Sequence, residues 1–135
     1  FESFLIDDLA HRLVTRPQAF DVIVMPNSYG DILSDAAAGL AGGLGAAASG
    51  CYGADYAYFE SAHGTAPDIA GKHIINPTAT LLSAAMMLDY LQLSDAATSL
   101  RTAIESVYAS GKVLTPDHGG RASTEDFCRA VGDEL

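Results

Sequence analysis

Basic side chains are scarce in this sequence. Seven lysines and arginines stand against seventeen aspartates and glutamates, for a formal net charge of −10. That charge repels nucleic-acid phosphates and anionic lipid headgroups, so we expect neither a nucleic acid nor a membrane as partner. The arginines are also spread along the chain, whereas a di- or tricarboxylate is bound by a convergent group of them. We therefore expect at most a partial active site.

Cysteine, long apolar runs and a nucleotide fingerprint are also lacking. The two cysteines, Cys51 and Cys128, form no Cys-x-x-Cys pair, which favours free thiols in a reducing compartment. No signal peptide and no membrane-spanning run is present, so we expect the cytoplasm, or the mitochondrial matrix in a eukaryote. No Gly-x-Gly-x-x-Gly occurs, which excludes an ordinary Rossmann nucleotide site. The chain starts at Phe1, just before an expected helix, which predicts a fragment of a longer protein.

About half of the sequence is apolar, which predicts a packed globular fold. Leucines at helical spacing predict a helix over residues 4–14, and the β-branched run 20–25 predicts a strand buried on both faces, as in parallel sheets. A helix over 31–40 follows, and this order of elements predicts an α/β architecture. Further along we expect a glycine- and alanine-rich passage between domains (39–53), a strand (57–60), a long functional loop (61–76), a helix buried nearly all round from Asn76-Pro77, an amphipathic helix (95–109), and a short helix from Ser123, with Asp126 at capping-box spacing.

Asp31 and Asp35 are the clearest candidates for metal binding. They lie four residues apart, so on a helix they share one face, where two like charges destabilise the helix unless something lies between them. Mg²⁺ or Mn²⁺ prefers such carboxylate oxygens. The alternative is that Asp31 interacts with the helix dipole while Asp35 faces solvent. Asp7, an acid in the first turn of the first helix, is by itself also explained by the dipole.

The segment from Glu60 to Gly71 is the second candidate site. Its glycines let backbone amides approach a phosphate, and His63 and Thr65 can donate hydrogen bonds. Asp68 can accept hydrogen bonds from two ribose hydroxyls and would repel a 2′-phosphate. An ordered surface loop without a ligand explains the same composition equally well.

Several motifs in register carry a family resemblance. They are Phe20-Asp21-Val22-Ile23-Val24-Met25-Pro26-Asn27, Gly30-Asp31-Ile32-Leu33-Ser34-Asp35, His63-Gly64-Thr65-Ala66-Pro67-Asp68-Ile69-Ala70-Gly71-Lys72, Asn76-Pro77 and Ser83-Ala84-Ala85-Met86-Met87-Leu88. Over nearly its whole length the chain resembles the C-terminal part of the isocitrate/isopropylmalate dehydrogenases. That resemblance implies their α/β fold of two domains, with residues 1–42 in the smaller, dimer-forming and metal-binding domain and 43–135 in the larger, cofactor-binding one.

The resemblance also implies residue roles. Asp31 and Asp35 match acids that bind Mg²⁺ or Mn²⁺, and Asp7 matches an acid that completes the metal site of the neighbouring subunit, which implies a homodimer with shared active sites. Asp68 and Ile69 match the members that use NAD, whereas members that use NADP tend to carry Lys and Tyr. The implied cofactor-binding residues are Glu60, His63, Gly64, Thr65, Ala66, Pro67, Asp68, Ile69 and Asn76.

The implied activity is the oxidative decarboxylation of a 2-hydroxy acid with NAD. The family's catalytic Lys and Tyr would lie upstream of Phe1, so the fragment alone is expected to be inactive. Gly42-Gly43-Leu44-Gly45 and His63-Gly64-Thr65 resemble the isocitrate enzymes more than the isopropylmalate enzymes, which often have Gly-Ser-Leu-Gly and His-Gly-Ser. The alternatives are 3-isopropylmalate, homoisocitrate, tartrate or malate as substrate, a non-catalytic regulatory subunit, or a dimerisation module without nucleotide affinity.

Overall fold

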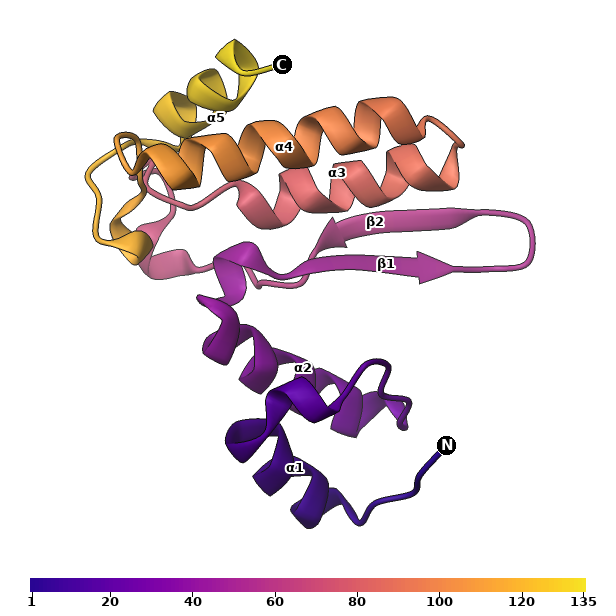
Figure 1. The fold of residues 1–135 in the computed structure, drawn as a ribbon. Coiled ribbons are helices and arrows are strands. Elements are labelled where there is room, and N and C mark those ends of the chain that lie inside the picture. Colours follow the sequence, from indigo (N-terminus) through magenta and orange to yellow (C-terminus); the bar gives the residue numbers. More distant parts are fainter. The chain divides into compact units, whose positions relative to one another are not determined.

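The structure is a computed structural model that describes residues 1–135, and the chain divides into two compact units, Phe1–Gly43 and Leu44–Leu135. The mixture of helices with a sheet agrees with the expected α/β class (Figure 1). No helix combines the length and the hydropathy needed to cross a membrane. Both cysteines are free thiols, as expected.

The first unit consists of two helices, α1 (Ile6–Thr15) and α2 (Asn27–Ala41), with a 3-10 turn at Pro17–Ala19. Its small core is formed by Leu9 and Leu13 of α1 with Leu33 of α2. The helix predicted over residues 4–14 is confirmed, and the one predicted over 31–40 begins earlier, after Pro26. Gly42, at a φ of 126°, ends α2.

The strand predicted over residues 20–25 is wrong for this structure. The segment is extended but pairs with no other strand, and Val22 and Val24 are 80% and 84% exposed. A strand is stabilised by the hydrogen bonds of its neighbours, and the first unit contains no other strand to supply them. The segment is apolar, as the sequence shows, but the first unit has no surface that buries Val22 and Val24.

The second unit is built on an antiparallel hairpin of β1 (Ala48–Tyr52) and β2 (Ala57–Ser61). Strand β2 was expected, whereas β1 lies in the stretch expected to be only a passage between domains. Gly50 stands opposite Phe59, and a Cβ on Gly50 would come within 3.0 Å of the Phe59 ring. The glycine that made β1 look irregular in the sequence therefore leaves room for its cross-strand aromatic partner.

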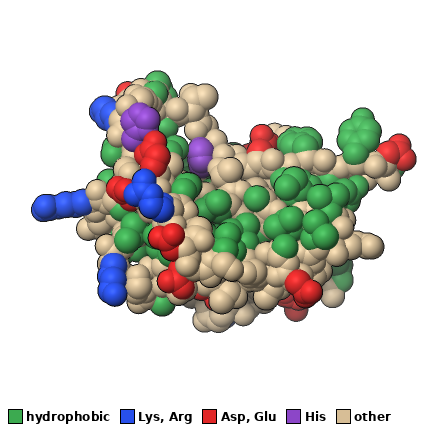
Figure 2. All heavy atoms as spheres, turned by 90° about the horizontal axis from the view of Figure 1, so that it is seen from above, with side chains coloured by type: hydrophobic (Ala, Val, Ile, Leu, Met, Phe, Trp, Pro, Cys, Tyr) green, Lys and Arg blue, Asp and Glu red, His purple; other side chains and the backbone are tan.

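Helix α3 (Thr78–Tyr90) covers one face of this hairpin (Figure 1). The buried Ser83 hydroxyl accepts a hydrogen bond from the Ser49 backbone N–H (3.1 Å) and lies 2.7 Å from the carbonyl oxygen of Glu60, so it joins the helix to both strands. The expectation that α3 is buried nearly all round is wrong, because Met87 and Tyr90 are exposed. Figure 2, which views the molecule from above Figure 1, shows apolar side chains over much of the visible surface.

Helices α4 (Ser94–Ser110) and α5 (Thr124–Asp133) complete the second unit, α4 packing on α3 and α5 on α4. Their core centres on Phe127, which is fully buried among Ala103, Ile104, Val107 and Val131. The amphipathic helix was predicted correctly, with Gly111 in the left-handed region at its end. The capping box at the start of α5 is confirmed: Ser123 accepts from the Asp126 N–H, and the Asp126 side chain accepts from the Ser123 N–H.

The first turn of α5 also holds the loop that precedes α3. The Thr124 N–H donates to the His73 carbonyl (2.9 Å), and the Thr124 hydroxyl donates to the Ile75 carbonyl (2.6 Å). On the surface, His73 Nδ1 lies 2.6 Å from Glu125 Oε1. The pKa of the Glu125 carboxyl lies below its usual value. The main cause is the hydrogen bond from the Glu125 backbone N–H, and the second cause is the hydrogen bond with the His73 side chain. Backbone and side-chain bonds thus join the loop to a helix far along the chain.

Replacing Phe127 with Ala should lower the free energy of unfolding by about 3–5 kcal/mol, because it removes a buried ring and leaves a cavity in the core of α4 and α5. Chemical unfolding followed by circular dichroism measures this difference. The exposed neighbour Cys128, replaced with Ala, is the matched control and should change stability by less than about 0.5 kcal/mol. Equal effects of the two substitutions would contradict the placement of the core.

Replacing Glu125 with Gln should lower the melting temperature at pH 6, and the difference from the wild type should vanish toward pH 3. A carboxyl with a lowered pKa stabilises the fold above its ordinary pKa, and this contribution is lost as pH falls through the lowered value. Differential scanning fluorimetry at both pH values measures it. Glu105→Gln, at an exposed position of α4, is the control and should show no such trend. A difference that persists at pH 3 would contradict an electrostatic role.

Candidate functional site

The loop between β2 and α3 is shaped by residues with unusual backbone angles. Ala66 (φ 43°), Gly71 (φ 74°) and His73 (φ 56°) all lie in the left-handed region, and a short 3-10 helix, Pro67–Ile69, stands between the first two. The His63 ring nitrogen Nδ1 lies 3.0 Å from the Gly64 carbonyl oxygen. The loop is thus an ordered path that presents backbone groups and short side chains outward.

Most of the predicted cofactor residues are accessible in this loop. Glu60, Gly64, Thr65, Pro67 and Asp68 are exposed, and nothing lies within 4 Å of where a Gly64 Cβ would stand. The other members except Asn76 are half-buried, namely His63, Ala66 and Ile69.

A hollow of about 260 Å³ opens between the loop and the first turn of α5. Thr65, Ala66 and Ile69 line it on the loop side, and Thr124 and Glu125 line it on the helix side. The loop therefore offers exposed amides, a hydroxyl and the Asp68 carboxylate beside a concave surface, a set of groups that fits an adenosine moiety.

Asn76 differs from the rest of the predicted set, because it is only 3% exposed and its side chain serves the fold. Its Oδ1 accepts from the N–H of Thr78, the first residue of α3 (3.0 Å). Its Nδ2 donates to the Tyr108 hydroxyl (3.0 Å) and to Asp117 Oδ2 (2.9 Å). The structure thus separates Asn76 from the exposed members of the loop.

Asp117 was not recognised as a candidate in the sequence. It lies in the 3-10 turn Pro116–His118, with His118 Nε2 3.7 Å from Asp117 Oδ2. Partial burial alone raises the pKa of Asp117, but the neighbouring Thr115, Asn76 and His118 outweigh it and keep that pKa below its ordinary value. Two glycines, Gly119 and Gly120, follow the turn, and they were the signal available in the sequence. Gly119 has a φ of 77°, and a Cβ on Gly120 would collide with the Leu114 carbonyl.

The predicted metal-binding acids belong to the first unit. Asp31 and Asp35 are both exposed on α2, and neither carboxylate takes part in a hydrogen bond or ion pair within the chain. Asp7, in the first turn of α1, accepts a hydrogen bond from the Asp8 N–H. No group of three or more His, Cys, Asp or Glu side chains is arranged to hold a metal. Asp31 and Asp35 fit part of a divalent-cation site, because their oxygens are free and four residues apart on one helix.

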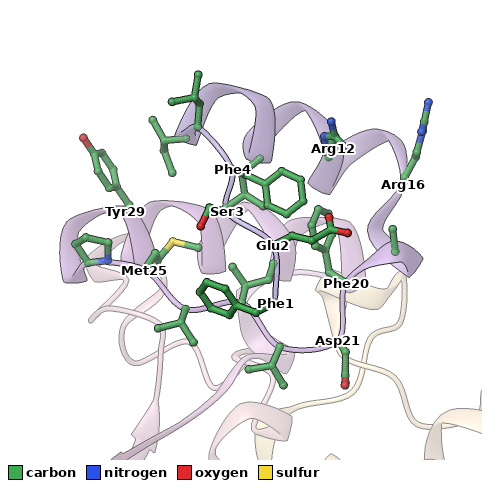
Figure 3. Close-up of a pocket in the computed structure, with 18 residues that line it drawn as sticks. Phe1, Glu2, Ser3, Phe4, Arg12, Arg16, Phe20, Asp21, Met25 and Tyr29 are labelled. Carbon is green, nitrogen blue, oxygen red and sulfur yellow. The ribbon is translucent and has the colours of Figure 1, made fainter.

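A second hollow, in the first unit, does not contain these acids. It measures about 860 Å³ and lies between the N-terminal segment and the extended segment 20–25 (Figure 3). Phe1, Phe4, Phe20 and Met25 contribute to its apolar lining, whereas Asp7, Asp31 and Asp35 do not line it. This hollow lies along the unpaired segment 20–25, and the charged residues that line it are Glu2, Arg12, Arg16 and Asp21.

Comparison with known proteins gives consistent matches. A Thermus thermophilus protein named isocitrate/homoisocitrate dehydrogenase is 55% identical over 134 residues, 99% of this chain and 40% of that protein. The mitochondrial isocitrate dehydrogenase [NAD] subunit alpha of Sus scrofa is 53% identical over 98% of this chain and 38% of that protein. The crystal structure of an isocitrate dehydrogenase from Methylococcus capsulatus superposes with a TM-score of 0.93 at 44% identity, covering 96% of this chain and 39% of that chain.

The chain thus spans about two fifths of the curated relatives that it matches. The family described as isocitrate/isopropylmalate dehydrogenase matches over residues 1–135, that is, over the whole chain. The resemblance first seen in the motifs is confirmed, and this chain belongs to the isocitrate/isopropylmalate dehydrogenase family.

Proposed function

We propose that the protein to which this chain belongs oxidises and decarboxylates isocitrate to 2-oxoglutarate, with NAD as hydride acceptor and Mg²⁺ or Mn²⁺ as metal. The observation that carries the proposal is the pair of unengaged, exposed carboxylates of Asp31 and Asp35 on one helix. Family membership and the names of the relatives from Thermus thermophilus and Sus scrofa support it.

The role of Asp31 and Asp35 is to hold the cation and, through it, the substrate. A divalent cation bound there would supply Lewis-acid chemistry to the substrate's hydroxyl and adjacent carboxylate. The two aspartates would supply oxygen ligands, and a cation between them would offset the repulsion between their negative charges. Because this chain brings no third acid to them, the site is completed from elsewhere, and we propose Asp7 of a second subunit for that position.

The role of the loop from Glu60 to Ile69 is to bind and orient NAD, which accepts the hydride when bound. Exposed backbone amides at Gly64 and Thr65 can approach the phosphates closely. The Asp68 carboxylate is exposed, so it could accept hydrogen bonds from the two ribose hydroxyls and would repel a 2′-phosphate. Glu60, at the end of β2, is proposed to lie near the nicotinamide ribose.

The proposed assembly is a dimer with shared active sites, in which the first unit meets its counterpart and the second binds the cofactor. The chain has no general base beside Asp31 and Asp35, so the proposed catalytic Lys and Tyr and the substrate arginines belong to the remainder of the protein. The name of the Thermus relative includes homoisocitrate, which makes homoisocitrate the second candidate substrate. The presence of Asp31, Asp35 and Asp68 favours a catalytic over a regulatory subunit.

Replacing Asp35 with Asn in the full-length protein should lower kcat/KM for isocitrate by about a hundredfold or more, because it removes a ligand from a cation worth several kcal/mol to the reaction. NADH formation measures it, with isocitrate, homoisocitrate, 3-isopropylmalate, tartrate and malate each tested with Mg²⁺ and Mn²⁺. Asp95→Asn is the control, since Asp95 is likewise an exposed aspartate on a helix, and it should leave activity unchanged.

The substrate panel separates the alternatives. Activity on another member of the panel would keep the chemistry and change the substrate. No activity on any of them, in a folded wild-type dimer, would favour a regulatory subunit. Activity that survives in Asp35→Asn would contradict the metal site.

The double replacement Asp68→Lys with Ile69→Tyr should raise the ratio of kcat/KM for NADP over NAD by about tenfold or more, because it exchanges a repelling charge for an attracting one at the 2′-phosphate. Steady-state kinetics with both cofactors measures the ratio. Asp133→Lys makes the same charge change at an exposed position of α5, away from the loop, and should leave the ratio unchanged. An unchanged ratio in the double variant would show that Asp68 does not face the ribose.

A further inference from the structure

The side chain of Asn76 has no donor left for a ligand. The Thr78 N–H can only donate, so the atom of the Asn76 amide that faces it must be the oxygen. That orientation turns the nitrogen toward Tyr108 and Asp117, and its two hydrogens are taken up by these two acceptors. Since the residue is only 3% exposed, a cofactor bound in the loop cannot reach the amide without breaking these bonds.

We propose that Asp117 and Tyr108 are positioning residues for NAD binding, because they hold the Asn76 side chain at the end of the loop. This inference rests on the proposed function, in which the loop binds NAD. The four residues Asn76, Thr78, Tyr108 and Asp117 are called the Asn76 network below.

The residues of the Asn76 network bond to one another and pack against other parts of the chain. The Tyr108 hydroxyl accepts from Asn76 and lies 2.8 Å from Thr78 Oγ1, and either of these two hydroxyls can be the donor. The Tyr108 ring packs against Phe127, with centroids 5.4 Å apart. Gly45 approaches from the other side, where a Cβ would stand 3.0 Å from Asn76 Cβ and 3.1 Å from Asp117 Oδ2. The network is therefore a closely packed joint between α3, α4 and the turn at Asp117.

Asp117 is the strongest acceptor in the network. Its lowered pKa keeps it ionised at neutral pH, and a hydrogen bond from an amide to a carboxylate is stronger than one between neutral groups. Removing the carboxylate leaves a buried N–H of Asn76 without a partner, which is costly in a site this enclosed. We therefore expect the Asn76 amide to shift toward another partner, and the backbone at Ile75 and Asn76 to shift with it.

Movement at Asn76 would reach the proposed cofactor site directly. Ile75 lines the hollow beside the loop, one residue before Asn76. The other end of the loop is fixed independently, because the buried Ser83 hydroxyl binds the Glu60 carbonyl. A loop fixed at both ends holds its amides in one place, whereas a loop released at Asn76 must be ordered again when NAD binds, and this weakens binding.

The test compares Asp117→Ala, Asp117→Asn and Tyr108→Phe in the full-length protein, with Asp133→Ala as control for an exposed acid. We expect Asp117→Ala to raise the dissociation constant of NAD, measured by isothermal titration calorimetry, by about tenfold, which corresponds to about 1.4 kcal/mol. Tyr108→Phe should weaken NAD binding in the same direction. Asp117→Asn retains an acceptor oxygen and should restore most of the affinity. The KM for isocitrate and kcat at saturating NAD should stay near their wild-type values.

Two further measurements separate positioning from direct contact. Hydrogen–deuterium exchange of the protein without cofactor should quicken at residues 71–78 in Asp117→Ala and return toward normal in Asp117→Asn. The variants Asn76→Ala, Asp117→Ala and their combination form a double-mutant cycle for the NAD dissociation constant. If Asp117 acts through Asn76, the combination should bind NAD no worse than Asn76→Ala alone.

Each contrary outcome has its own meaning. Additive losses in the cycle would overturn the inference, because Asp117 would then contact NAD itself. Wild-type affinity in Asp117→Ala and in Tyr108→Phe would overturn it too. If Asp117→Ala fails to fold, unchanged binding and exchange in Tyr108→Phe suffice to overturn it. A folded wild type that does not bind NAD would overturn the proposed function and this inference with it, whereas normal NAD binding in all variants overturns the inference alone.

Discussion

The second unit depends on one buried amide, that of Asn76. Apolar contacts hold its helices together, but they do not fix where the long loop ends and α3 begins. The amide does so, because its oxygen accepts from the first N–H of α3 and its nitrogen bonds to α4 and to the turn that follows α4. A buried polar group is costly unless every hydrogen has a partner, and this requirement allows one arrangement of the three elements. That arrangement fixes the position at which the loop ends.

The groups on the surface divide by the kind of ligand they can bind. The first unit offers free carboxylates on a helix, which attract a cation, and the second offers an ordered loop with exposed amides and one carboxylate. Neither unit gathers the arginines that would bind a multiply charged acid. In the proposed function the chain therefore supplies groups that bind the metal and the cofactor, whereas the groups that bind and convert the substrate would belong to the rest of the protein.

Local rules predicted the elements whose causes are local. The capping box at Ser123 and Asp126 and the glycine that ends α4 are each decided within a few residues, and both were read from the sequence. Segment 20–25 failed as a strand because pairing needs a partner that the first unit lacks, and β1 was missed because its small residues match an aromatic neighbour known only from the register. The candidate site divides in the same way. The loop is a candidate from its composition alone, whereas Asp117 is not, because its partner Asn76 lies 41 positions away.

The backbone of His73 lies in the left-handed region, and its side chain contacts Glu125. A side chain with a φ of 56° is strained by about 1–2 kcal/mol, and histidine is among the residues that tolerate this region best. A glycine would follow the same path without strain but would give up the contact with Glu125, so the gain and the loss oppose each other. The backbone bond from Thr124 to the carbonyl of residue 73 is independent of the side chain at that position. We therefore expect a glycine at residue 73 to leave the course of the loop unchanged.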